Sequence, residues 1–151
     1  SSDVCSSDLF YKVNKENNMG ATVDTFKTTH QAVVGLLELV GSSQGEQRIG
    51  ALNSLKESVL GHIEDENRVI QEAIGKPDAD GSFKTSAQNF LDELGNIAKA
   101  ALLPFFDKYS SSDVVGSREF MGDFSGIKGA LADRMSFEEE QFYPELEKHG
   151  Y

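Results

Sequence analysis

Residues 46–74 read EQRIGALNSLKESVLGHIEDENRVIQEAI, and this stretch carries the clearest structural signal in the chain. Its apolar side chains recur every three or four residues, which is the spacing of one face of an α-helix. Two polar residues, His62 and Glu66, fall on that same face and lie one helical turn apart. Because an amphipathic helix must bury its apolar face against another element, the stretch predicts a helical bundle with polar groups in its interior.

Three other segments show the same periodicity. Together with the first stretch, they predict helices over residues 21–41, 45–75, 82–108 and 117–148. Pro104 lies inside the third of these and should kink or fray its last turn, because proline removes a backbone donor and crowds the carbonyl four residues back. No segment alternates with the two-residue period of a strand. Short linkers favour antiparallel neighbours, so we expect an all-α protein, an up-and-down antiparallel four-helix bundle, over residues 19–151.

The composition narrows the classes of partner. The 151 residues are enough for one domain, and 25 Asp and Glu against 14 Lys and Arg give a formal net charge of −11. An acidic chain argues against a nucleic-acid-binding surface, which needs clustered Lys and Arg. Because neither an apolar stretch of about 18 residues nor a signal peptide is visible, we expect a cytoplasmic protein with no membrane partner. We expect residues 1–18, which include Cys5, to be non-native or disordered.

Polar residues also fall on the apolar faces of two other predicted helices. The first helix places His30 on its face, and the fourth places Arg134 and Glu138 there, one turn apart. The third helix has only apolar residues on its face. Burying such polar groups without partners costs several kcal/mol each, so they must meet one another or a metal ion. His30, His62, Glu66, Arg134 and Glu138 should therefore converge in the interior.

These residues carry a resemblance to a known family. His62-x-x-x-Glu66 resembles the second-helix motif of hemerythrin-like (HHE cation-binding) domains, and EEEQFYP at 138–144 resembles their fourth-helix motif. Thr29-His30 resembles the ligand position on their first helix. The resemblance implies a four-helix bundle in which five histidines and two carboxylates hold a non-haem di-iron centre for oxygen or a related small molecule.

The resemblance carries over to only part of that ligand set. His30, His62, Glu66 and Glu138 match metal-ligand positions, whereas Arg134 stands where the fourth helix of the family has a histidine. The histidines of the family's third helix have no counterpart here. The resemblance therefore implies a reduced site of four ligands that binds iron, or another divalent metal such as manganese or zinc, or that senses a small ligand.

An alternative is that Arg134 has replaced the metal. Its guanidinium carries a permanent charge and five donors, so it can bridge two carboxylates, here Glu66 and Glu138. The chain would then be a metal-free bundle that acts by binding a protein, because residues 61–68 and 130–134 also faintly resemble anti-sigma factors. A third alternative is a degenerate family member with neither role. We expect no ordinary enzyme, since three histidines leave no constellation for nucleophilic catalysis.

Overall fold

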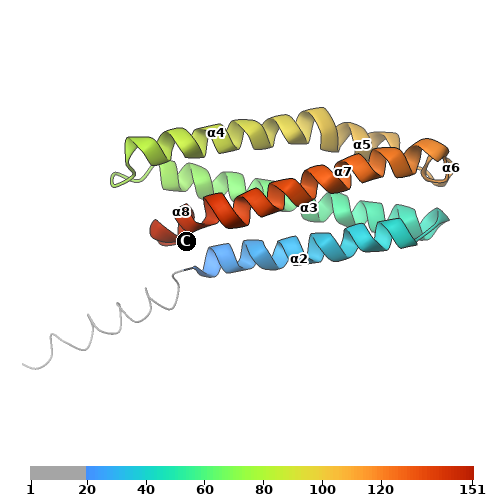
Figure 1. Ribbon diagram of the computed structural model, residues 1–151, viewed down its shortest axis with the longest axis horizontal. Coiled ribbons are helices and arrows are strands. Elements are labelled where there is room, and N and C mark those ends of the chain that lie inside the picture. Colours follow the sequence, from blue (N-terminus) through green and yellow to red (C-terminus); the bar gives the residue numbers. More distant parts are fainter. Residues whose placement is uncertain (1–19) are drawn as a thin grey trace, which may run out of the picture.

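The computed structural model describes residues 20–151 and shows four long helical segments lying side by side (Figure 1). The first two are single helices, α2 (Ala21–Ser42) and α3 (Gly45–Ile74). The third segment consists of α4 (Gly81–Ile97), a π-helical turn η1 (Ala98–Leu102) and α5 (Leu103–Lys108). Each predicted helix of this half is therefore present, with its ends within two residues of the expected positions.

The fourth segment follows a short helix, α6 (Ser112–Val115), which the sequence did not predict. It consists of α7 (Arg118–Phe137), a second π-helical turn η2 (Glu138–Phe142) and α8 (Tyr143–Lys148). Successive long segments run in opposite directions (Figure 1), and residues 20–151 contain no strand. The predicted all-α, up-and-down bundle is confirmed. The prediction for residues 1–18 falls outside the described residues.

Both π-helical turns lie directly ahead of a proline. The backbone N–H of Leu103 donates to the carbonyl of Ala98, and that of Tyr143 donates to the carbonyl of Glu138, five residues back in each case. Pro104 and Pro144 follow as the second residues of α5 and α8. A π turn widens the helix where the proline ring would crowd a carbonyl, so the chain stays helical through both prolines. The frayed last turn expected at Pro104 is therefore not present, because the helix continues to Lys108.

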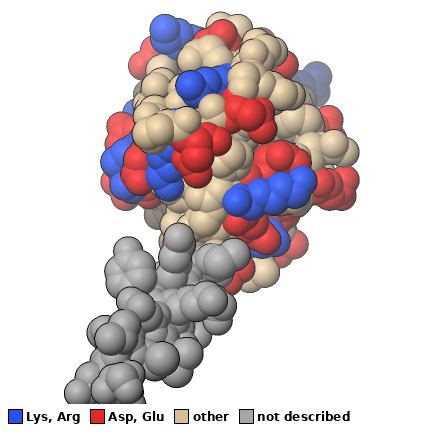
Figure 2. Space-filling view, turned by 90° about the vertical axis from the view of Figure 1, so that its left-hand side faces the viewer, with Lys and Arg blue, Asp and Glu red and all other residues tan. Residues whose placement is uncertain are grey.

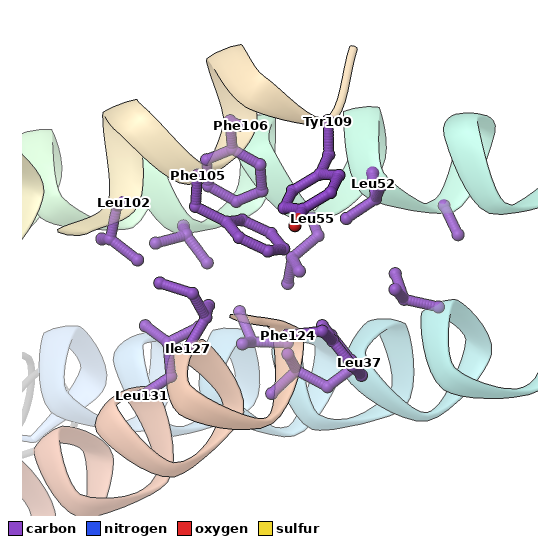
Figure 3. Packing of buried hydrophobic residues seen from close by; sticks show 14 of the residues in the cluster. Leu37, Leu52, Leu55, Leu102, Phe105, Phe106, Tyr109, Phe124, Ile127 and Leu131 are labelled. Carbon is purple, nitrogen blue, oxygen red and sulfur yellow. The ribbon is translucent and has the colours of Figure 1, made fainter. Parts of the chain in front are cut away.

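The apolar core is divided into two clusters. One lies toward the end of the bundle with α6, where Phe105 of α5 points toward Phe124 and Ile127 of α7 (Figure 3). The other lies toward the end with α8 and is built around Ile70 and Phe90. Along each of α2, α3 and the α7–η2 segment, the buried residues between the two clusters are polar. The bundle therefore has a polar layer between two apolar halves.

The surface carries both signs of charge. On the end of the bundle that faces the viewer in Figure 2, acidic and basic side chains are intermingled around uncharged ones. Within residues 20–151, no helix has the length and apolar character needed to cross a membrane.

Candidate metal centre

The polar layer contains four buried side chains from three parts of the bundle. His30 comes from α2, His62 and Glu66 come from α3, and Glu138 is the first residue of η2. Glu66 is fully buried and Glu138 is 2% exposed. Each of the four offers one ligand atom, and these atoms all lie within 4.8 Å of one another. The structure thus brings together the four residues that the sequence singled out as candidate ligands.

The spacing of these atoms matches the spacing of ligands around one ion. Nε2 of His30 lies 2.9 Å from Nε2 of His62 and 3.1 Å from Oε1 of Glu138. Nε2 of His62 lies 3.1 Å from Oε1 of Glu66 and 3.6 Å from Oε1 of Glu138. Ligands on bonds of about 2.1 Å are about 3.0–3.4 Å apart in tetrahedral or right-angled geometry. A single metal ion therefore fits among these four atoms.

The hydrogen-bonding atoms of the layer also suit a bound cation. Among residues 20–151, Nδ1 of His30 and Oε2 of Glu66 are buried without a hydrogen-bond partner. In addition, the two Nε2 atoms face each other, so in the absence of a metal at least one of them must carry a hydrogen. Buried polar groups are nearly always paired. Two neutral imidazoles and two carboxylates are a donor set that suits a divalent transition metal.

Tyr143 is the residue of this centre that the sequence reasoning missed. It is fully buried, and its hydroxyl donates a hydrogen bond of 2.6 Å to Oε1 of Glu66. The hydroxyl oxygen also lies 3.1 Å from Nε2 of His30, 3.3 Å from Nε2 of His62 and 3.3 Å from Oε1 of Glu138. It therefore contacts all four candidate ligand atoms.

The π turn explains why periodicity did not indicate Tyr143. Counting four residues on from Glu138, as in an α-helix, points to Phe142 as the next residue facing the layer. Because η2 contains one residue more per turn, the residue five positions on, Tyr143, lies over Glu138 instead. The proline at 144, four residues after the acidic run 138–140, was the available signal, since proline inside a helix requires some local rearrangement.

The pKa values of the two carboxyl groups of the layer are shifted in opposite directions. Burial raises the pKa of Glu66 to about 7, with a further contribution from nearby Glu138. Burial acts likewise on Glu138, but its hydrogen bonds with His30 and His62 outweigh this effect and hold its pKa well below the usual range. Burial by itself would lower the pKa of His62. The hydrogen bonds of His62 to Glu138 and Glu66 outweigh burial and raise this pKa to about 9. Burial and both carboxylates raise the pKa of Tyr143 far above its ordinary value.

Arg134 lies beside the centre and does not bridge its two carboxylates. Its Nε donates to Oε2 of Glu138 at 3.1 Å, which is the oxygen that faces away from the histidines. Its two other nitrogens donate to Oε2 of Glu93 and to the carbonyl of Phe90, both on α4. Within residues 20–151, Arg134 forms ion pairs with Glu93 and Glu138 and none with Glu66. The expectation that Arg134 bridges Glu66 and Glu138 is therefore wrong, because the guanidinium turns toward α4.

A small apolar cavity adjoins the centre. Its volume is about 30 Å³, and the four candidate ligands and Arg134 form one side of it. The other side is apolar and comes mostly from Val33, Val59, Leu94, Ile97, Leu102, Leu131 and Met135. The third helical segment contributes no polar residue to the layer but supplies much of this apolar wall. A cavity volume of about 10–15 Å³ is enough for one water molecule, so about 30 Å³ admits only a very small molecule.

Comparison with known proteins gives one match. The sequence model of the hemerythrin HHE cation-binding domain matches residues 21–146. Neither the curated proteins nor the solved structures include one that matches the chain. The matched range runs from the start of α2 into α8, so it covers all the residues of the polar layer.

Proposed function

Because the chain belongs to the hemerythrin HHE cation-binding family, we propose that it binds one transition-metal ion through His30, His62, Glu66 and Glu138. The observation that carries this proposal is the convergence of four ligand atoms within 4.8 Å in a buried layer. Four ligand atoms at that spacing can all bind a single ion. A second ion would need further ligands, and the third helical segment has no histidine to supply them.

We propose non-haem iron as the ion, with manganese or zinc as the other candidates from the same donor set. If both carboxylates are ionised, the guanidinium of Arg134 offsets one charge, and a divalent ion more than offsets the one that remains. When bound, the iron would supply an open coordination position for a small diatomic molecule. The adjoining apolar cavity of about 30 Å³ supports this use, since its wall excludes larger ligands and favours an uncharged one.

The residues of the chain have separate tasks in this proposal. The two imidazoles and two carboxylates hold the ion, and Arg134 keeps Oε2 of Glu138 paired so that its Oε1 faces the centre. The aliphatic side chains around the cavity keep bulk water from the ion. Sensing of a small ligand would then work through its occupation of this cavity.

The test is metal uptake by protein that is purified without a histidine tag. After removal of metal with a chelator, Fe(II) is added without oxygen, and elemental analysis should give one iron per chain. The bound ion should also raise the melting temperature by mass action on the native state. Loss of a residue that only supports a ligand typically weakens metal binding about 10–100-fold. Because His62 is itself a ligand in this proposal, His62→Ala should weaken iron binding by more than that. His149→Ala is the matched control, because His149 packs against Phe83 away from the centre. Equal iron binding by His62→Ala and the wild type would contradict the proposal.

A metal-free role is the second candidate, and the ion pair between Arg134 and Glu138 is the observation that favours it. In that case the bundle would act by binding a protein, as anti-sigma factors do. The pair neutralises one carboxylate, but Oε2 of Glu66 stays without a hydrogen-bond partner among residues 20–151. The metal-binding proposal accounts for both carboxylates. Absence of any metal response in the wild type would favour the metal-free role.

A further inference from the structure

We propose that Tyr143 is a fifth ligand of the metal ion, so that the centre has two nitrogen and three oxygen donors. This inference rests on the proposed function, because it requires that an ion is bound by His30, His62, Glu66 and Glu138. It assigns to the chain a ligand that the family resemblance did not indicate. The distances around the hydroxyl, the number of available hydrogen atoms and the fixed position of the side chain support it.

The distances place the hydroxyl oxygen of Tyr143 at ligand spacing from all four other donors. The separations are 2.6 Å to Glu66, 3.1 Å to His30, and 3.3 Å to both His62 and Glu138. Two ligands at a right angle on bonds of about 2.1 Å are about 3.0 Å apart. An oxygen that lies near 3 Å from four donors therefore has the spacing of one further ligand of the same ion.

With both carboxyl groups ionised, the hydrogen atoms available do not account for these contacts. A tyrosine hydroxyl has one hydrogen, which here points to Glu66, and it accepts at most two more. A carboxylate cannot donate, so the contact of 3.3 Å with Glu138 joins two lone-pair-bearing oxygens. The contact between the two Nε2 atoms at 2.9 Å competes for the same few hydrogens. One cation among the five atoms satisfies all of them at once.

Packing fixes the position of the Tyr143 side chain. Tyr143 is fully buried, and its ring stacks on the ring of His30 at a centroid distance of 5.5 Å and an interplanar angle of 20°. The ring of Phe26 lies 5.7 Å away on the same side of the layer. The backbone of Tyr143 is held by the hydrogen bond from its N–H to the carbonyl of Glu138. An ion that enters the layer therefore meets the hydroxyl rather than displacing it.

Coordination changes one bond of the side chain. The O–H bond of Tyr143 breaks, the oxygen keeps the electron pair and forms the bond to the metal, and the proton passes to the buffer. A metal ion promotes this loss in the same way that it deprotonates a coordinated thiol or water. A phenolate oxygen is a hard, anionic donor, so it favours the ferric ion.

The experiment uses the colour of an iron–phenolate bond. Metal-free full-length protein is loaded with ferric nitrilotriacetate, and iron content and visible absorption are measured on the same samples. The wild type should bind one Fe(III) and show a visible charge-transfer band. Tyr143→Phe should lose the band. Tyr109→Phe is the matched control, since Tyr109 also donates to a carboxylate, that of Asp123, but far from the centre, and this variant should keep the band.

The outcomes separate this inference from the proposed function. Iron bound by the wild type without a charge-transfer band would overturn the fifth ligand and leave the four-ligand site intact. A band that survives in Tyr143→Phe would overturn the inference in the same way. Failure of the wild type to bind any iron would overturn both. If Tyr143→Phe does not fold, resonance Raman spectra of the wild type and Tyr109→Phe decide, because excitation into the band must enhance tyrosinate vibrations in both.

Discussion

At the scale of single residues, Arg134 shows how a charge at the edge of a buried site is used. Its side chain is 9% exposed and covers Oε2 of Glu138, while Oε1 of the same carboxylate faces the histidines. The guanidinium carbon also lies 4.0 Å from the centroid of the Phe90 ring, which adds a cation–π contact. Arg134 thus supports a ligand of the centre without occupying the position of the ion.

Replacing Arg134 with alanine should destabilise the metal-free protein. The change leaves Oε2 of Glu138 buried without its cation, and breaking a buried ion pair costs about 3–5 kcal/mol. We expect the lower end of that range, about 3 kcal/mol, because Oε1 keeps its partners His30 and His62. Urea unfolding in the presence of a chelator measures the loss.

Arg68→Ala is the control for this prediction. Arg68 pairs with Asp65 on the surface of α3, and their side chains are 69% and 60% exposed. Exposed pairs contribute less than about 1 kcal/mol, so this variant should unfold almost like the wild type. If Arg134→Ala and Arg68→Ala lower the free energy of unfolding equally, the ion pair of Arg134 with Glu138 is screened by solvent.

At the scale of elements, the two long composite segments use different devices at their N-termini. The side chain of Asp80 accepts a hydrogen bond of 2.7 Å from the backbone N–H of Phe83 and so caps α4. Ser117 holds the equivalent position before α7, but its side chain makes no capping bond. The position of a cap is thus visible in the sequence, whereas its hydrogen bond depends on the side-chain rotamer.

The difference between these two caps gives a matched pair of variants. Asp80→Ala should lower the free energy of unfolding by about 1 kcal/mol, because an N-cap bond is lost. Ser117→Ala should change it by less than about 0.5 kcal/mol, as is usual for an exposed residue without a specific bond. Chemical denaturation monitored by circular dichroism measures both. An equal loss of unfolding free energy in the two variants would show that the Asp80 side chain does not stabilise α4 by its capping bond.

The π turns are the element-scale feature with the largest effect on the centre. In a regular helix, the residue over Glu138 would be Phe142, which has no donor atom for a metal. The turn η2 brings Tyr143 to that place and leaves the ring of Phe142 stacked on Phe90, with centroids 4.1 Å apart. A single added residue in one turn therefore changes the chemistry of the polar layer.

At the scale of the whole molecule, the polar layer makes the stability of the metal-free protein depend on pH. The pKa of His62 is raised from 6.5 to about 9. Its contribution to the stability of the folded protein is therefore full below pH 6.5 and is lost as the pH rises toward 9. The raised pKa of Glu66 acts in the same direction between its ordinary value of 4.5 and about 7. The lowered pKa of Glu138 acts oppositely, and its contribution is lost as the pH falls below 4.5.

The melting temperature of chelator-treated protein should therefore be highest near pH 5–6 and should fall by several degrees toward pH 9. In a chain of this size, about 1 kcal/mol corresponds to about 2–4 °C. Thermal unfolding followed by circular dichroism between pH 4 and pH 9 measures this curve. Bound metal should reverse part of the fall, because metal ions compete better with protons at high pH. A flat curve in the chelator would contradict the shifts of His62 and Glu66.

The sequence by itself determined the helical bundle and its candidate ligands. The three- and four-residue spacing of apolar side chains is a local property, and polar residues such as His30 and Glu66 are conspicuous where they interrupt it. The position of the layer between two apolar clusters follows from the same spacing, since each interruption lies at a similar height in antiparallel helices. These features could be predicted because they need only the period of a regular helix.

Only the tertiary structure decided the place of Tyr143 and the partners of Arg134. Tyr143 faces the layer because η2 departs from the regular period, and such a departure is set by Pro144 and by packing around it rather than by the local pattern. Arg134 turns to Glu93 and Phe90 because α4 lies beside it, which depends on how the segments pack. A long side chain on a known helix face can reach several neighbours, and the packed fold alone selects among them.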